Sequence, residues 1–243
     1  MIWDDQIVQL CHTHLMESLP SATDRARILA VSVKRRSDWL NALPISSLGL
    51  FLEDEAVRIS VGLRLGARLC EPHACPCGAD VDALGLHSLS CRRSAGRLSR
   101  HHNINEILWR ALTKAGVPST KEPYGLSRTD RKRPYELTLI PWSSGKCAVW
   151  DVTVIDTFAN SYINITSVTA GGAAEIAAAR KLDKYRDLAS GYEVIPVAME
   201  TMGPMNPCGA DFINGIGRQI ALLTQDQRET FSLAEALNRS AEV

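Results

Sequence analysis

Apolar residues recur at helical spacing in the first part of the chain. Val57, Val61 and Leu65 follow one another at steps of four, with arginines at other positions around the turn. A stripe of this kind predicts an amphipathic helix that packs one face against a core. We expect this helix over residues 52–69, within a helical region that covers residues 1–69.

The remainder of the chain mixes helical and strand-like patterns. Apolar stripes predict helices over residues 101–116, 173–190 and 214–223, and the first two are closed by Gly116 and Gly191. Short apolar, β-leaning runs predict strands over residues 137–142, 147–155 and 192–199. This order implies an α/β fold with a mixed central sheet flanked by helices. The polar tail that follows is expected to fray.

The segment that joins the two regions follows neither pattern. It is short, punctuated by glycine and proline, and rich in cysteine and histidine. The chain therefore divides into a helical region at 1–69, a small Cys/His-rich segment at 70–92, an α/β domain at 93–224 and a polar tail at 225–243.

Composition narrows the classes of protein that this chain can belong to. The 243 residues are 45% hydrophobic, and Lys+Arg and Asp+Glu both number 27, so the formal net charge is zero. This balance excludes a histone-like polycation but not a local basic surface. No apolar run is long enough to cross a membrane, and Asp4 and Asp5 do not fit a signal peptide. We therefore expect an intracellular protein that has no membrane partner.

The cysteines point to a metal site. In a reducing compartment, clustered thiols indicate metal ligands before disulfides. A Cys-x-Cys-x9-His-x3-Cys pattern is formed by Cys75, Cys77, His87 and Cys91. These residues can close a tetrahedron around Zn²⁺, and metal binding would supply folding energy of about 10 kcal/mol to a segment without its own core. Cys70 and His73 compete as ligands, and the alternative is ordinary buried cysteines beside a surface histidine.

An acidic residue interrupts the most apolar of the expected strands. Alternate side chains of a strand share a face, so Asp151 belongs with Val149 and Thr153 in an otherwise buried run. A buried carboxylate is costly unless a cation meets it. The alternative is a hydrogen-bonded Asp at a fraying strand end.

The expected helix over residues 173–190 offers a cation. Lys181 falls within its apolar stripe, whereas Lys184 is rotated by roughly 60° from that face. The Lys181 ammonium could meet Asp151, or its aliphatic stem could simply lie along the apolar surface.

The order of these features resembles the C-terminal part of site-specific non-LTR retrotransposon proteins. The matching features over residues 38–223 are the Cys-x-Cys…His…Cys cluster, a helix, Arg-Pro before one strand, Asp-Val-Thr on the next and Lys-x-x-Lys-Tyr on a helix. That part of those proteins carries a zinc knuckle and a restriction-like endonuclease of the PD-(D/E)xK type. The resemblance implies this fold, a structural Zn²⁺ and Mg²⁺-dependent nicking of DNA.

The resemblance also implies roles for individual residues. In that family two carboxylates on adjacent strands hold Mg²⁺, and a lysine stabilises the charge that develops on the phosphate. Asp151 would be the second carboxylate. Lys181 or Lys184 would replace the lysine that is missing at Thr153, and Tyr185 follows on the same helix face.

One position departs from the family pattern. The family has Asp after the proline, whereas Tyr135 follows Pro134 here. Glu136 comes next, but on a regular strand its side chain points to the opposite face, so it could bind Mg²⁺ only through a bulge or a register shift. We therefore expect this copy to be weakened or inactive.

Two basic tracts flank these features and are candidate contacts to nucleic acid. The first consists of Arg92, Arg93, Arg97 and Arg100, and the second of Arg128, Arg131, Lys132 and Arg133. Each tract could equally be a solvated surface.

Three functions remain open at this point. The first is an Mg²⁺-dependent nicking endonuclease that acts in the nucleus. The second is an inactive nucleic-acid-binding relic, with DNA or the element's RNA as its partner. The third is a zinc-stapled interaction module in which Asp151 and Lys181 form a structural ion pair.

Overall fold

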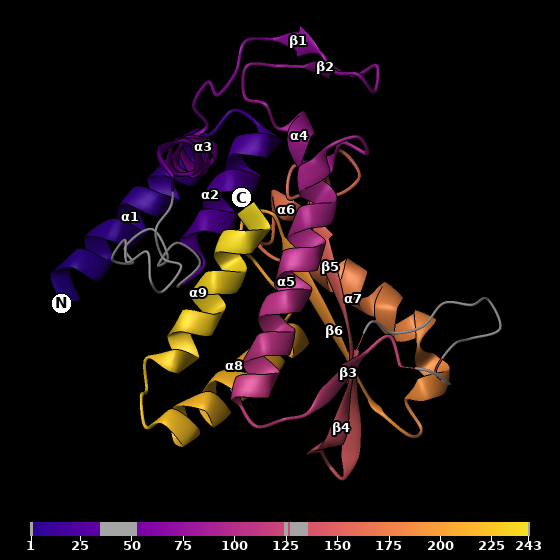
Figure 1. Cartoon of the computed structure of the whole chain (residues 1–243). Helices are drawn as coiled ribbons and strands as arrows, with labels where there is room; N and C mark the ends of the chain where they lie inside the picture. Colours follow the sequence, from indigo (N-terminus) through magenta and orange to yellow (C-terminus); the bar gives the residue numbers. More distant parts are fainter. Residues whose placement is uncertain (1, 35–52, 124–125, 127–135, 243) are drawn as a thin grey trace.

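A computed structural model describes residues 2–34, 53–123, 126 and 136–242 (Figure 1). The expected contacts Arg128, Arg131, Lys132 and Arg133, as well as Tyr135, lie outside the described residues. The N-terminal helices are α1 (Ile2–Ser18), α2 (Ala22–Ser32) and α3 (Asp54–Leu65). The Cys/His-rich segment contains β1 (His73–Ala74), β2 (Asp80–Val81) and α4 (His87–Ser90).

The α/β part begins with the long helix α5 (Ala95–Lys114). The strands are β3 (Ser119–Lys121), β4 (Glu136–Ser143), β5 (Lys146–Ile155) and β6 (Glu193–Glu200). The helices between and after them are α6 (Ile163–Thr166), α7 (Gly172–Lys184), the 3₁₀ turn η3 (Arg186–Leu188), α8 (Pro207–Thr224) and α9 (Glu229–Glu242).

The central sheet is mixed, which confirms the predicted fold class at this level. Its four strands lie in the order β3-β4-β5-β6. The pairs β3/β4 and β4/β5 are antiparallel, and β5/β6 is parallel. Ser144 and Gly145 both have positive φ, 50° and 74°, as a tight hairpin turn between twisted strands requires. The turn joins the two strands that the sequence predicted over residues 137–142 and 147–155.

One face of the sheet carries the main core. Trp150 and Ile195 from the strands pack against Phe212 of α8, and α5 and α9 complete the cluster (Figure 1). The rings of Trp150 and Phe212 have centroids 5.6 Å apart. Burial of large aromatic and aliphatic side chains of this kind is the dominant stabilising term in a domain of this size.

The opposite face is covered by α7, whose contacting residues are small. Ala174, Ala177 and Ala178 pack against Ile155 of β5 and Ala198 of β6. Because alanine adds little thickness, the backbone of α7 can lie close to the sheet. The last turn of the helix is thereby brought over β5.

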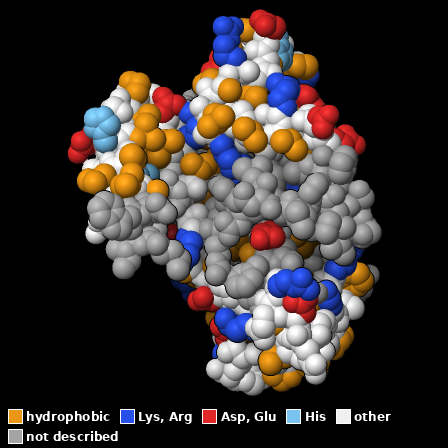
Figure 2. Space-filling model, turned by 90° about the vertical axis from the view of Figure 1, so that its left-hand side faces the viewer, with side chains coloured by type: hydrophobic (Ala, Val, Ile, Leu, Met, Phe, Trp, Pro, Cys, Tyr) orange, Lys and Arg blue, Asp and Glu red, His pale blue; other side chains and the backbone are white. Residues whose placement is uncertain are grey.

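A third cluster fastens the N-terminal helices to the end of the sheet. Leu63 of α3 and Leu89 of α4 pack with Phe158 and Met202, which follow β5 and β6. The buried Arg27 of α2 donates a hydrogen bond from Nε to the carbonyl of Leu63 at 2.8 Å. Figure 2 views the molecule from the side where α1 and α3 lie, and hydrophobic side chains there are interspersed with charged ones.

Three details differ from the sequence prediction. In α3 the buried residues include Leu63, whereas Leu65 of the predicted stripe is 76% exposed, because the face of the helix that meets α2 lies elsewhere. Helix α7 ends at Lys184 rather than near Gly191. The tail expected to fray instead forms α9, which buries Leu237 in the main core.

Helix α8 begins against the free edge of β6. The Asn206 side chain accepts a hydrogen bond from the Ala198 N–H at 2.8 Å and donates one to the Pro196 carbonyl at 3.1 Å. Gly209 lies directly above this contact, so a Cβ there would come within 2.7 Å of Asn206 Oδ1 and 3.2 Å of the Pro196 carbonyl oxygen. The start of α8 therefore requires glycine at this position.

We expect Gly209→Ala to destabilise the fold by about 1–3 kcal/mol, the usual cost of overpacking a core. Urea unfolding monitored by circular dichroism measures this change. Gly191→Ala is the matched control, because nothing lies within 4 Å of a Cβ at that position. Equal stability of the two variants would contradict the close approach of α8 to β6.

Candidate functional site

The Cys/His cluster is built by a small hairpin and one helical turn. Strands β1 and β2 pair antiparallel and carry Cys75 and Cys77 on the loop between them. This loop closes through a hydrogen bond from the Cys75 N–H to the Ala79 carbonyl at 2.8 Å. His87 begins α4 and Cys91 follows it, one turn apart as the spacing predicted.

The four ligand atoms fit a tetrahedral metal. Cys75 Sγ and Cys91 Sγ lie 3.7 Å apart, Cys77 Sγ lies 3.2 Å from His87 Nε2, and all four atoms are within 4.8 Å of one another. A tetrahedral Zn²⁺ with Zn–S bonds of about 2.3 Å places its sulfurs about 3.8 Å apart. The backbone N–H of Ala79 lowers the pKa of the Cys77 thiol, which favours the thiolate. This cluster could therefore bind a metal such as zinc.

The two competing ligands are engaged elsewhere. Cys70 Sγ donates to the Asp82 carbonyl at 3.3 Å, and His73 Nδ1 lies 2.8 Å from the Glu71 carbonyl. Neither residue belongs to the four-residue cluster. The fold of the hairpin therefore favours the other four residues as the candidate ligands.

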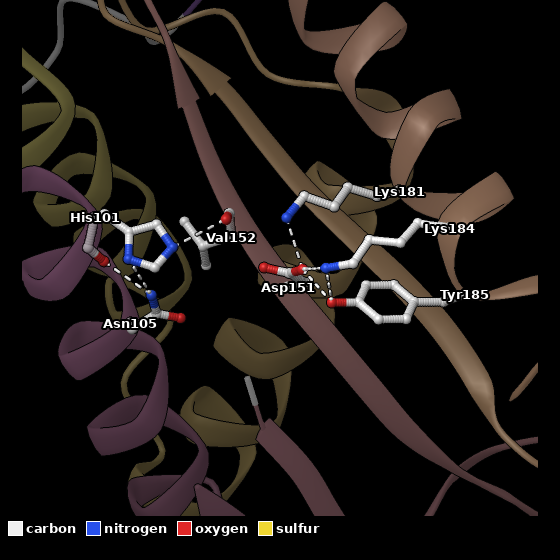
Figure 3. A network of polar contacts seen from close by, with 7 residues as sticks. All are labelled: His101, Asn105, Asp151, Val152, Lys181, Lys184 and Tyr185. Carbon is white, nitrogen blue, oxygen red and sulfur yellow. Dashed lines mark hydrogen bonds and ion pairs between the residues drawn. The ribbon is translucent and has the colours of Figure 1, made fainter. Parts of the chain in front are cut away.

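Asp151 is the centre of a second polar cluster. It lies on β5 on the face covered by α7 and is 9% exposed. Its Oδ2 accepts hydrogen bonds from Lys181 Nζ at 2.6 Å and from Tyr185 Oη at 2.7 Å, and Lys184 Nζ is 3.6 Å away (Figure 3). The lysine within the apolar stripe of the helix therefore does meet the acidic strand. A buried carboxylate with two cations and a phenol is well compensated.

The end of α7 explains why both lysines reach Asp151. The helix stops at Lys184 and Tyr185 caps it with φ −108°, so the chain leaves the regular spiral at this point. Tyr185 is 1% exposed and donates its hydroxyl to the carboxylate, while Lys184 also contacts that hydroxyl. Lysines in the last turn are further favoured by the negative end of the helix dipole.

Two residues of α5 approach the same strand, and the sequence prediction missed them. The His101 ring donates from Nε2 to the Val152 carbonyl at 3.1 Å, and Asn105 donates to the His101 carbonyl at 2.9 Å (Figure 3). Val152 lies two residues beyond Trp150, the β5 residue that pairs with Glu136 of β4, so His101 contacts the β5 backbone past this pair. Burial lowers the pKa of His101 and favours the neutral ring. The four-residue spacing of His101 and Asn105, which places both on one face of α5, is the sequence signal that could have indicated this contact.

Glu136 lies on the other side of the sheet. It pairs directly with Trp150, so its side chain shares the Trp150 face, whereas Asp151 faces α7. Glu136 is fully buried, and neither carboxyl oxygen has a partner among the described residues. Burial raises the pKa of Glu136 to about 8, so the carboxyl is largely protonated at neutral pH.

The described residues around Asp151 do not fit the Mg²⁺ site of the family. Mg²⁺ requires oxygen ligands at near-octahedral geometry, usually with more than one protein carboxylate in a nuclease site. Asp151 supplies one carboxylate, and its Oδ2 already binds ammonium and phenol groups. Glu106 is the acidic residue of α5, and it is paired with Lys121 on β3 rather than directed at Asp151.

The first basic tract divides into exposed and buried members. Arg92, Arg93 and Arg97 are exposed, as a nucleic-acid contact would be. Arg100 is 5% exposed and donates to the Leu89 carbonyl of α4 at 2.6 Å. Arg100 therefore ties the Cys/His cluster to α5, in addition to any role in binding.

Comparison with known proteins adds no relative. No protein-family model matches the chain, and no curated protein is significantly similar to it. Within the described residues, every helix is too short or too polar to span a bilayer.

Removal of metal should unfold the Cys/His-rich segment. We expect one zinc per chain by elemental analysis, and we expect a strong chelator to expose residues 70–91 to protease, because metal binding supplies the folding energy of such a segment. Cys77→Ser should lose the metal. The control Cys70→Ser should retain it, and equal zinc content in the two variants would contradict the assigned ligands.

Glu136 should make stability fall as pH rises. Its folded pKa is about 8 against an ordinary value of 4.5, so between these values the unfolded chain ionises first and the native state loses stability. Glu136→Gln should flatten the pH dependence of the urea midpoint between pH 5 and 9. The exposed Glu71→Gln should leave it unchanged, and parallel curves for wild type and Glu136→Gln would contradict the buried, protonated carboxyl.

Proposed function

We propose that this chain is a DNA-binding module of the kind found at the C-terminal end of site-specific non-LTR retrotransposon proteins. It would combine a zinc knuckle with a restriction-endonuclease-like core, and its Mg²⁺-dependent nicking would be weakened. The observation that carries the proposal is the convergence of Lys181, Lys184 and Tyr185 on Asp151. These are the residue types, in the order along the chain, that the resemblance implies.

The lysines account for phosphate binding at this site. Each Nζ lies at the end of an aliphatic stem, and more than a fifth of each side chain is exposed, 23% for Lys181 and 28% for Lys184. A phosphate that approaches the cluster would therefore meet two partly exposed ammonium groups. Positioned cations of this type stabilise negative charge on a phosphate.

The carboxylates account for the weakened chemistry. Tyr135 stands where the family has Asp, and Glu136 is directed away from Asp151. A site with a single carboxylate holds Mg²⁺ poorly. A copy that diverges in this way would therefore lose DNA cleavage before it loses DNA binding.

The second candidate is a relic that binds nucleic acid without any cleavage. It is favoured by the Asp151–Lys181 contact itself, because an ammonium on Oδ2 occupies the direction from which a metal would approach. In the third candidate this contact is purely structural. The two binding candidates differ from the third in expecting salt-dependent retention of DNA, or of the element's RNA, which releases counterions from the phosphates.

Nicking of supercoiled plasmid with Mg²⁺ or Mn²⁺ tests the proposal. We expect slow nicking by the wild type and a loss to background for Asp151→Asn, which keeps the shape but removes the charge. Tyr135→Asp, which restores the family's carboxylate, should raise the rate by about tenfold or more, equivalent to about 1.4 kcal/mol of barrier. Tyr135→Asn is the control for loss of the ring alone.

The outcomes separate the candidates. Nicking that persists in Asp151→Asn would show that the cleavage does not come from this site. DNA binding without nicking, in the wild type and in Tyr135→Asp, would favour the relic. Absence of salt-dependent binding to DNA or RNA would leave the structural module.

A further inference from the structure

A small polar cavity lies beside the C-terminal half of β5. Its volume is about 280 Å³, and its walls include Arg97 and Arg100 of α5, Ser90 of α4, Thr153 and Asp156 of β5 and its exit, and Tyr162. We call it the edge pocket. The β5 residues that line it follow Trp150, which pairs with Glu136 of β4.

Two polar atoms of residues that line the edge pocket lack partners among the described residues. Arg100 is 95% buried, and its Nε has no hydrogen-bond acceptor although its other end donates to Leu89. The Thr153 hydroxyl is likewise buried and without a partner. Buried donors that remain unsatisfied cost about 1–3 kcal/mol each, so a site of this kind favours a ligand that can accept from both.

The charge of the pocket favours an anion. Arg97 and Arg100 contribute two positive charges, and Arg180 stands behind Tyr162, to whose hydroxyl it donates at 2.7 Å. Asp156 is the opposing group, and its Oδ1 accepts from the Phe158 N–H at 2.9 Å, but this single carboxylate faces two arginines. The wall therefore remains positive.

The position of the pocket connects it with the Asp151 cluster. Thr153 lies two residues after Asp151 on the same face of β5, a distance of about 6.6 Å along a strand. Phosphates of one DNA strand recur every ~3.4 Å along the helix axis. The separation of about 6.6 Å corresponds to about two of these steps, so a strand with one phosphate at Lys181 would bring the second phosphate along to the pocket.

We propose that the edge pocket binds a backbone phosphate of nucleic acid about two positions along the strand from the one at Lys181, with Arg97, Arg100 and the Thr153 hydroxyl as hydrogen-bond donors. This inference rests on the proposed function, because it assigns a second phosphate of the same strand to the same sheet edge. It gives the Thr153 hydroxyl a role as a hydrogen-bond donor to phosphate.

Anisotropy of a labelled single-stranded oligonucleotide, measured with the full chain at two salt concentrations, tests the proposal. We expect Thr153→Val and Arg97→Gln each to weaken binding about tenfold or more, as the loss of one hydrogen bond to a charged group does. Arg92→Gln is the matched control, since it removes an exposed charge of the same tract that does not line the pocket. It should cost less than Arg97→Gln, and Thr153→Val should leave the salt dependence unchanged.

Titration with inorganic phosphate distinguishes the pocket from the proposed function. Amide shifts of Thr153 and Asp156 in NMR spectra should move with phosphate in the wild type and not in Thr153→Val. If the wild type does not bind the oligonucleotide at all, the proposed function fails, whereas these shifts still report on the pocket. Binding of free phosphate with no effect of either variant on the oligonucleotide would overturn the assignment to nucleic acid. Absence of phosphate shifts, or equal losses for Arg92→Gln and Arg97→Gln, would overturn the pocket itself.

Discussion

The burial of strand β5 on both faces is the constraint on which the Asp151 cluster depends. Trp150 and Val152 face the main core, whereas Asp151 faces α7. A carboxylate in such a strand is tolerated only when cations and hydrogen-bond donors surround it. Lys181, Lys184 and Tyr185 therefore compensate the buried carboxylate, which allows the strand to fold with Asp151 in it. The same side chains would also bind phosphate.

The Cys/His cluster is connected to this strand through a short chain of contacts. Helix α4 supplies His87 to the cluster and Leu89 to the hydrophobic contact with Phe158, just after β5. Arg100 of α5 binds the Leu89 carbonyl. A metal at the cluster would thus hold in place the segment that also forms one wall of the edge pocket.

The sequence predicted the elements whose signals are local. The two strands of the β4–β5 hairpin, the α5 stripe and the grouping of the four Cys/His residues depend on residue pattern and spacing, which are readable along the chain. The Asp151–Lys181 contact was also predictable, because a charge within an apolar stripe requires a partner.

The features that the sequence did not predict depend on tertiary contacts. Helix α9 has a polar composition, and only its packing on α5 and α8 buries Leu237. The approach of His101 to Val152 depends on the packing of α5 beside β5, two elements far apart in the chain, which no local pattern records. The face on which Glu136 lies follows from strand alternation, but its complete burial follows from the helices that cover that face.

The alanines of α7 have a consequence for how the Asp151 cluster tolerates change. Ala174, Ala177 and Ala178 determine the distance between the helix and the sheet, although none of them is among the hydrogen-bonding partners of Asp151. A larger side chain at any of these positions would increase the distance between α7 and the sheet and move both lysines away from Asp151. The contact of the lysines with Asp151 therefore depends on the small size of the alanine side chains, so the geometry of the site could change through substitutions in which no polar residue changes.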